Sequence, residues 1–161
     1  MVLKIMTGKP EALIPGFMRI FIFLSVCFLF PAPSDSFAQK EISTDVKVIY
    51  ASSGPKYIDP GLRHIGRELR SVFRYTSYKL IQETRMTLLP QSDGKVNLPG
   101  GRVLVATPLA IKGKRIKYRI RIMEGGNRIF QTEILLEKNR SITIGGPRHK
   151  KGYLLFNISG K

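Results

Sequence analysis

One segment of the chain has the apolar period of a helix, whereas the segments on both sides of it alternate like strands. Five apolar residues within residues 60–74 recur at helical spacing: Leu62, Ile65, Leu69, Val72 and Phe73. They fall within an arc of about 100°, which is the width of a stripe that faces a core. Asp59 and Pro60 supply an N-cap and a proline at the first helical position. The sequence therefore predicts one amphipathic helix over residues 60–74.

The other segments indicate strands, because apolar and polar residues alternate and Gly, Pro or Asn stands at the junctions. The expected strands are residues 44–51, 78–89, 102–111, 114–123, 128–137, 141–144 and 152–158, with 95–98 as a short edge piece. This order predicts an α+β fold, in which one amphipathic helix packs on a largely antiparallel sheet of about six to eight strands. One helix covers only part of such a sheet, so a barrel-like and a sandwich-like arrangement both stay open.

Two hairpins have a register that the faces of their strands specify. In the first hairpin, a turn at residues 112–113 places Thr107 opposite Tyr118. In the second, a three-residue loop at 125–127, with one residue in the left-handed conformation, gives the register that keeps apolar residues on one face of the hairpin and charged residues on the other. Its expected pairs are Ile122 with Phe130, Tyr118 with Ile134, Ile116 with Leu136, Arg119 with Glu133, and Arg115 with Glu137. These pairs give one apolar face and one charged face.

The N-terminal region has the pattern of an export signal. An apolar run at residues 20–30 follows Arg19 and precedes prolines and small residues that end at Ala38. A helix of that length spans about 16 Å, roughly half the hydrocarbon layer, so a transmembrane span is not expected. The sequence predicts a signal peptide over residues 1–38, with Met18 as the true start, and a single basic α+β domain over residues 39–161. The expected location is periplasmic or secreted.

Positive charge is the most unusual property of the composition. The chain has 27 Lys and Arg against 11 Asp and Glu, and residues 1–38 hold three of these cations and two of these acids. The remaining formal charge of +15 predicts attraction to anions, which outside the cytoplasm are membrane head groups, lipopolysaccharide phosphates and acidic polysaccharide. Nucleic acid is an unlikely partner, because export separates the protein from most of it and no binding motif for it is visible.

Two groups of cations are patterned, one on the helix and one on a strand, a third group lies in a loop, and each group has a structural alternative. The candidate anion-binding residues are Arg63, Arg67, Arg70 and Arg74 on one helix face, Lys117 and Arg121 on a strand face, and Arg148, Lys150 and Lys151 in a glycine-rich loop at 145–151. The helix group can instead be a solvated face, and the loop cations can simply keep the loop in water. On the strand, Arg115 and Arg119 are assigned to cross-strand pairing with Glu137 and Glu133.

Residues that carry catalysis or bind metals are scarce. The single cysteine, Cys27, lies in the leader, so residues 39–161 hold no disulfide and no cysteine-bound metal. His64 and His149 have no acid at ligand spacing, and no nucleophile motif such as G-x-S-x-G occurs. The sequence therefore predicts a protein that is not an enzyme and uses no metal or cofactor. An enzyme built on His149 is a third hypothesis, which requires that folding bring an acid close to it.

Three local motifs carry a resemblance to a family. The helix exit RYTSYKL at residues 74–80, the turn LPGGR at 98–102 and the loop IGGP at 144–147 are similar to a family of small exported proteins of Gram-negative bacteria. The resemblance implies a location and no activity or functional residue. Together with the charge, it favours a non-catalytic binding or assembly component of the cell envelope, with an envelope protein as the partner. The alternative is a secreted polyanion-binding protein that uses its surface arginines.

Overall fold

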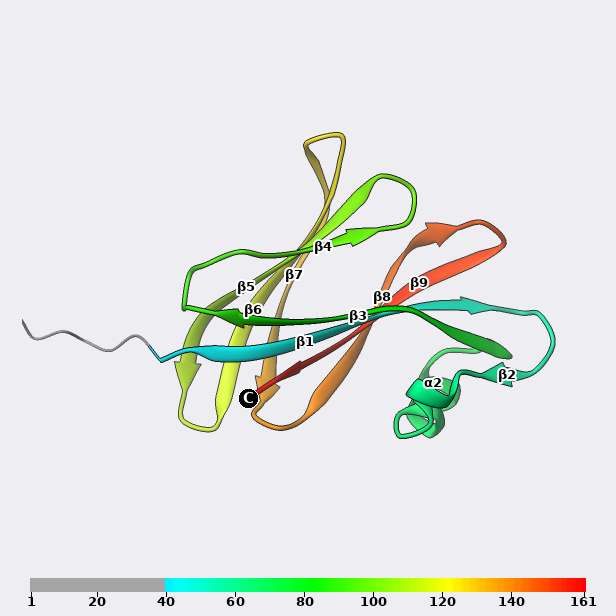
Figure 1. Ribbon diagram of the computed structural model, residues 1–161, viewed down its shortest axis with the longest axis horizontal. Helices are drawn as coiled ribbons and strands as arrows, with labels where there is room; N and C mark the ends of the chain where they lie inside the picture. The colour runs from blue at the N-terminus through cyan, green and yellow to red at the C-terminus, as the bar shows by residue number, and fades with distance from the viewer. Residues whose placement is uncertain (1–39) are drawn as a thin grey trace, which may run out of the picture. The chain divides into compact units, whose positions relative to one another are not determined.

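Nine strands and two short helical segments make up residues 40–161, the part of the chain that the computed structural model describes (Figure 1). The predicted signal peptide, residues 1–38, lies outside the described residues. The prediction that most of the domain is sheet, with one α-helix, is confirmed, but the α-helix is shorter than expected. The expected number of strands, six to eight, is too low, and the strands form two sheets that do not close into a barrel.

The larger sheet has five strands in the order β2-β3-β1-β9-β8. Their bounds are β1 Ile42–Ser52, β2 Tyr57–Ile58, β3 Ser77–Leu88, β8 Ser141–His149 and β9 Gly152–Gly160. Neighbouring strands are antiparallel except β2 and β3, which are parallel. The smaller sheet is antiparallel throughout and has the order β4-β5-β6-β7. Its strands are β4 Gly94–Leu98, β5 Arg102–Lys112, β6 Arg115–Glu124 and β7 Asn127–Glu137.

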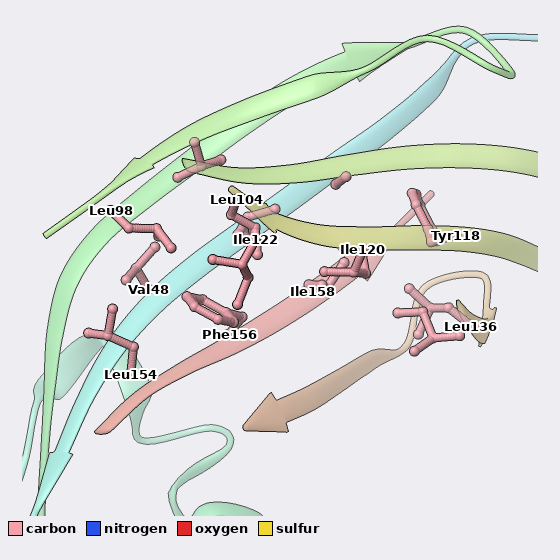
Figure 2. Close-up of a cluster of buried hydrophobic side chains, with 14 of the residues drawn as sticks. Val48, Leu98, Leu104, Tyr118, Ile120, Ile122, Leu136, Leu154, Phe156 and Ile158 are labelled. Carbon is pink, nitrogen blue, oxygen red and sulfur yellow. The ribbon is translucent and has the colours of Figure 1, made fainter. Parts of the chain in front are cut away.

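The main core lies between the two sheets, where apolar side chains of both interdigitate (Figure 2). Val48 and Phe156 of the larger sheet and Leu104, Ile120 and Ile122 of the smaller sheet all belong to this cluster. Each of these side chains is almost completely removed from water. Burial of this kind contributes about 1.5–3 kcal/mol for each large aliphatic or aromatic side chain, so it is the principal force that holds the sheets together.

The helical region packs on the opposite face of the five-stranded sheet. Leu62, Ile65 and Leu69 form a second cluster with residues of β1, β3 and β9. Ile49 of β1 and Leu155 of β9 contribute to this cluster, while their sequence neighbours contribute to the main core. The alternation of the strands thus gives the five-stranded sheet two buried faces, one towards the other sheet and one towards the helix.

The prediction of a continuous helix over residues 60–74 is wrong. A 3₁₀ turn, η2 (Pro60–Leu62), is followed by a non-helical turn and then by the helix α2 (Gly66–Val72). The Asp59 side chain caps the first turn by accepting a hydrogen bond from the Gly61 amide at 2.9 Å. The Tyr78 hydroxyl of β3 lies 3.0 Å from the Leu69 carbonyl and 2.5 Å from that of Phe73. This tertiary contact ends the helix early, and Phe73 has an extended backbone.

The predicted register of the β5–β6 hairpin is also wrong. Its two-residue turn consists of Gly113 and Lys114, and Thr107 lies opposite Arg119 instead of Tyr118. A bulge beside Pro108 then changes the register by one residue along the strand. The physical reason is that Leu104 and Ala106 face the core, whereas Thr107 lies on the outer face, where its hydroxyl contacts Asp93.

The predicted register of the β6–β7 hairpin is confirmed, but the loop is not. Tyr118 lies opposite Ile134 and Arg119 opposite Glu133, and all the other expected pairs are present. The turn contains two residues, Gly125 and Gly126, and both have a positive φ, which glycine adopts without steric cost. The predicted register needs one residue more than a two-residue turn supplies, and a bulge next to Met123 accommodates that residue.

Candidate anion-binding cleft

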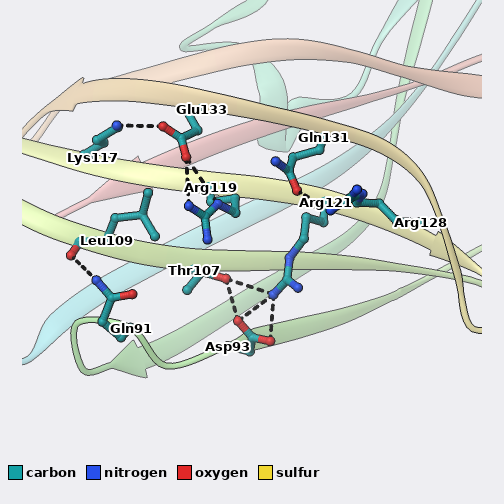
Figure 3. Close-up of polar contacts among 10 residues, drawn as sticks. All are labelled: Gln91, Asp93, Thr107, Leu109, Lys117, Arg119, Arg121, Arg128, Gln131 and Glu133. Carbon is teal, nitrogen blue, oxygen red and sulfur yellow. Dashed lines mark hydrogen bonds and ion pairs between the residues drawn. The ribbon is translucent and has the colours of Figure 1, made fainter.

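The cations of β6 lie on the outer face of the four-stranded sheet, where carboxylates pair with most of them (Figure 3). Glu133 accepts from Lys117 at 2.6 Å and from Arg119 at 3.0 Å. These two contacts, that of Lys117 first, lower the pKa of Glu133. Lys117 was a candidate for anion binding, and this ion pair partly satisfies its charge.

Arg121 has a similar role at the next position of the same face. Its guanidinium lies 2.7 Å from the Asp93 carboxylate, which also accepts from the Thr107 hydroxyl at 2.5 Å. The Thr107 bond and, to a smaller extent, Arg121 lower the pKa of Asp93. The Nε of Arg121 is buried and has no hydrogen-bond partner among the described residues. The arrangement anchors the loop before β4 to β6, so both strand candidates belong to ion pairs within the sheet.

The four helix arginines do not form the single stripe that a continuous helix would give. Arg67 and Arg70 lie on α2, Arg63 lies in the turn before it, and Arg74 lies two residues after its end. All four side chains are exposed, and none takes part in an ion pair within the described part of the chain. They are available to solution, but the structure does not gather them around a cavity.

A cleft lies at the end of the five-stranded sheet that carries β2 and the β8–β9 turn. It consists of two adjoining hollows of about 620 and 440 Å³, which share Tyr50, Lys79 and Leu80 in their linings. The first hollow extends to Tyr57 and Asp59, and the second extends to Pro99, Ile81, His149 and Lys150. Pro99 belongs to the β4–β5 turn, so the second hollow lies where both sheets meet the β8–β9 hairpin.

The pairing of three strands positions the polar groups of this cleft. Tyr50 of β1 lies opposite Lys79 of β3, and the Lys79 ammonium is 6.0 Å from the centre of the Tyr57 ring. The ring of His149 meets that of Tyr50 edge to face, with 5.9 Å between their centres. The cleft therefore has aromatic rings in its lining, and the Lys79 ammonium lies near one of them, that of Tyr57.

The β8–β9 hairpin brings a second ammonium to the cleft. Strand β8 continues to His149, so the loop expected at 145–151 is reduced to a turn at Lys150 and Lys151, with φ of +50° at Lys150. Next to this turn, Gly152 lies against the Ala51 carbonyl and the Tyr50 ring, where a Cβ has no room. This close approach lets the hairpin fold over β1 and places Lys150 in the cleft lining.

Two further contacts hold the same hairpin. Arg102 of β5 donates a hydrogen bond to the Arg148 carbonyl at 3.1 Å, and the Tyr153 ring packs 6.0 Å from that of Tyr75. Of the three loop candidates, Lys150 lines the cleft, while Arg148 and Lys151 are exposed beside it and line none of its surface. The structure thus brings together Lys150 and Lys79, a pair that sequence reasoning did not connect.

The cleft has the chemistry of a site for an anion with a non-polar or hydroxylated portion. Lys79 and Lys150 each offer three N–H donors, and the tyrosine hydroxyls add further hydrogen-bonding groups. Asp59 is the only carboxylate in the described lining, and its side chain is bonded to the Gly61 amide. The balance of charge in the cleft is therefore positive.

Comparisons of the chain with models of protein families, with curated proteins and with solved structures give no match. Within residues 40–161, no three His, Cys, Asp or Glu side chains gather as a metal site requires. No helix in the same range has the length and apolarity needed to cross a bilayer. His149, the residue of the enzyme hypothesis, contacts the Tyr50 ring and forms no ion pair with a described carboxylate.

Tyr50, Tyr57 and Lys79 were not among the candidates from the sequence. Tyr50 and Lys79 are single residues in ordinary alternating strands, and only the β1–β3 register places them side by side. Tyr57 belongs to a two-residue strand that has no recognisable pattern. To find this site from the sequence, one would have to predict that β1 pairs with β3, although the whole helical region separates these strands in the chain.

Proposed function

We propose that the chain is an exported, non-catalytic binding component of the bacterial cell envelope, and that it holds an anionic ligand in the cleft between Tyr50, Lys79 and Lys150. The position of two unpaired cations in a concave lining carries this proposal, because other cations without an ion pair in the described part, such as Arg115 and Lys95, line none of the cleft. On the strand faces, Lys47, Arg85 and Arg102 have carboxylate partners, as do Lys117, Arg119 and Arg121. Lys79 and Lys150 form no ion pair with any residue of the described region, although they line the hollows of the cleft.

The ligand is expected to be a phosphate or carboxylate group of the envelope. Free ammonium groups in a concave site attract anions more strongly than scattered charges do, because the walls of the cleft exclude part of the water. Phosphorylated head groups and acidic polysaccharide both supply such anions outside the cytoplasm. The tyrosine rings would pack against the apolar or sugar portion of the same molecule.

A second candidate function uses the exposed helix arginines for polyanion binding. Arg63, Arg67, Arg70 and Arg74 are all solvent-exposed and lack carboxylate partners among the described residues, which favours this alternative. The two candidates involve different residues and can be separated by substitution.

The experiment measures binding of the purified protein to vesicles that contain phosphatidylglycerol and to oligogalacturonate. We expect Lys79→Gln with Lys150→Gln to weaken binding about tenfold or more, which corresponds to about 1.4 kcal/mol. Lys112→Gln with Lys114→Gln removes the same charge from the β5–β6 hairpin and is the matched control. If only Arg67→Gln with Arg70→Gln weakens binding, the helix arginines are the site and the cleft proposal is wrong. The vesicle and oligosaccharide arms separate a lipid source from a sugar source.

Export is tested independently of binding. When the complete chain with a C-terminal tag is expressed in a Gram-negative bacterium, we expect it in the periplasmic fraction, with Gln39 as the first residue of the mature protein. N-terminal sequencing of this fraction measures the cleavage site. A protein that stays in the cytoplasm with residues 1–38 attached contradicts the location.

A further inference from the structure

Strand β7 is the longest exposed edge of the two sheets. It has 11 residues, and within the described chain it pairs only with β6. The other strands at the sheet edges are short or irregular, although β3 also has a free side beyond the two residues that pair with β2. β2 and β4 have two and five residues, and β8 contains Pro147 and an irregularity after Gly145. The backbone N–H and C=O groups on the free side of β7 can therefore pair with another strand on either side of the bulge at Ile129.

An apolar slot adjoins this edge. It has a volume of about 230 Å³ and lies between β7 and β8, with a lining of Ile122, Ile129, Phe130, Gly145, Gly146 and Pro147. Ile129 and Phe130 remain 47% and 38% exposed, although they are large apolar residues. Gly146 lies so close to the Phe156 ring that a Cβ has no room there, and the β8 side of the slot consequently has almost no side chains. The slot can accept an apolar side chain from outside.

The charge next to the slot is positive and unpaired. Arg128 precedes Ile129 on β7, and Arg148 follows Pro147 on β8. Both are exposed, and neither forms an ion pair in the part of the chain that is described. Arg128 donates only to the Gln131 side chain, at 3.1 Å. By contrast, Glu133 in the middle of β7 is already neutralised by Lys117 and Arg119.

We propose that β7 and the adjoining slot bind an extended segment of a partner protein, with apolar residues at alternate positions and Asp or Glu beside them. The segment adds as a new strand to the four-stranded sheet and pairs its backbone with the free side of β7. One apolar side chain enters the slot between Phe130 and Pro147, and a neighbouring carboxylate meets Arg128 or Arg148. This surface uses none of the residues that line the cleft, so it goes beyond the proposed function and does not depend on it.

The test uses a labelled synthetic peptide of alternating valine and threonine with aspartates at both ends, and a second peptide with lysines in their place. Fluorescence anisotropy with the purified protein measures binding. We expect the acidic peptide to bind about tenfold or more tightly than the basic one, because the two arginines attract its carboxylates. Ile129→Lys places a charge on the edge and is expected to abolish binding. Leu89→Lys alters another exposed apolar residue and is the matched control.

Arg128→Glu keeps the proposal testable if Ile129→Lys fails to fold, and it should reverse the preference between the two peptides. The proposal is overturned if neither peptide binds, or if both β7 variants bind the acidic peptide as the unaltered protein does. It is also overturned if the protein forms a dimer that Ile129→Lys dissociates, because a second copy then occupies the edge. Lys79→Gln with Lys150→Gln should leave peptide binding unchanged, which separates this result from that of the cleft.

Discussion

Tyr118 shows how one polar residue joins the two sheets. Its hydroxyl lies 2.8 Å from the Thr44 hydroxyl of β1, and both groups are buried. Gly160 of β9 leaves the room for this contact, because a Cβ there would lie 2.7 Å from the tyrosine oxygen. The hydrogen bond satisfies two polar groups inside an otherwise apolar core, and it fixes where the sheets can cross.

Removal of the Tyr118 hydroxyl should therefore destabilise the protein. Tyr118→Phe leaves the Thr44 hydroxyl buried without a partner, and we expect the free energy of unfolding to fall by about 1–3 kcal/mol. Denaturant unfolding measures this change. The double variant Tyr118→Phe with Thr44→Val removes both polar groups and should recover part of the loss. Equal stabilities of the single variant and the unaltered protein would show that the hydrogen bond is not formed.

The same residue makes stability depend on alkaline pH. Burial, opposed by the Thr44 hydrogen bond, raises the pKa of Tyr118 above its ordinary value of 10.0, and burial likewise raises that of Tyr78. The folded protein thus binds these protons more tightly than the unfolded chain does. The resulting stabilisation is complete below pH 10 and is lost as the pH rises through the folded pKa values. In unfolding measured against pH, Tyr118→Phe should show a smaller alkaline decrease.

At the scale of elements, the outer face of β6 is a ladder of ion pairs and not a free basic surface. The sequence pattern showed four cations on alternate positions and assigned Arg115 to Glu137 and Arg119 to Glu133. Of these two ion pairs, the described residues form only that of Arg119. The tertiary structure added Asp93, which comes from the loop before β4 and lies 28 residues from its partner Arg121. Because this pair joins β6 to the loop that leads into β4, it stabilises the edge of the four-stranded sheet.

The ladder predicts a loss of stability in acid. The pKa of Asp93 is lowered below its ordinary value of 3.8, so the unfolded chain binds this proton more tightly than the folded protein. Its stabilising effect is complete above about pH 4 and disappears as the pH falls through the lowered value. Asp93→Asn should therefore be less stable than the unaltered protein near pH 7, and the two denaturation curves should converge in acid. A difference that stays constant with pH would contradict this assignment.

At the scale of the whole molecule, five of the nine described carboxylates take part in ion pairs, and an excess of unpaired positive charge remains. It is found at the α2 turn, in the hairpins and at the cleft. Like charges that cannot be neutralised within the protein repel one another and oppose folding. An anionic partner would remove this repulsion, which is consistent with the two binding surfaces that we propose.

This repulsion predicts that added sodium chloride stabilises the protein, because salt screens exposed charges beyond about 10 Å at 0.1 M. We expect the melting temperature to rise by about 4 °C between low and moderate salt, a change of about 1 kcal/mol. Arg63, Arg67, Arg70 and Arg74 replaced together by Gln should melt higher at low salt and respond less to salt. A melting temperature that falls with salt in the unaltered protein would show that ion pairs outweigh repulsion.

Local signals predicted some elements well and failed where distant segments meet. The register of β6 and β7 followed from alternation alone, because only one pairing kept both faces consistent. The helix was predicted too long, because the stripe of Leu62, Ile65 and Leu69 also fits a 3₁₀ turn followed by a short helix. The Tyr78 hydroxyl that meets the helix end belongs to β3, which no helical pattern includes.

The amino-acid sequence by itself determined that the protein is mostly strand with one helical region, and that its charge is strongly positive. These properties depend on local periodicity and on composition, which a single chain displays directly. The division into two sheets, the ion pairs of Lys117 and Arg121, and the cleft between Tyr50, Lys79 and Lys150 were decided by the tertiary structure. Each of these requires contacts between strands that are far apart in the chain, and no local pattern specifies which strands become neighbours.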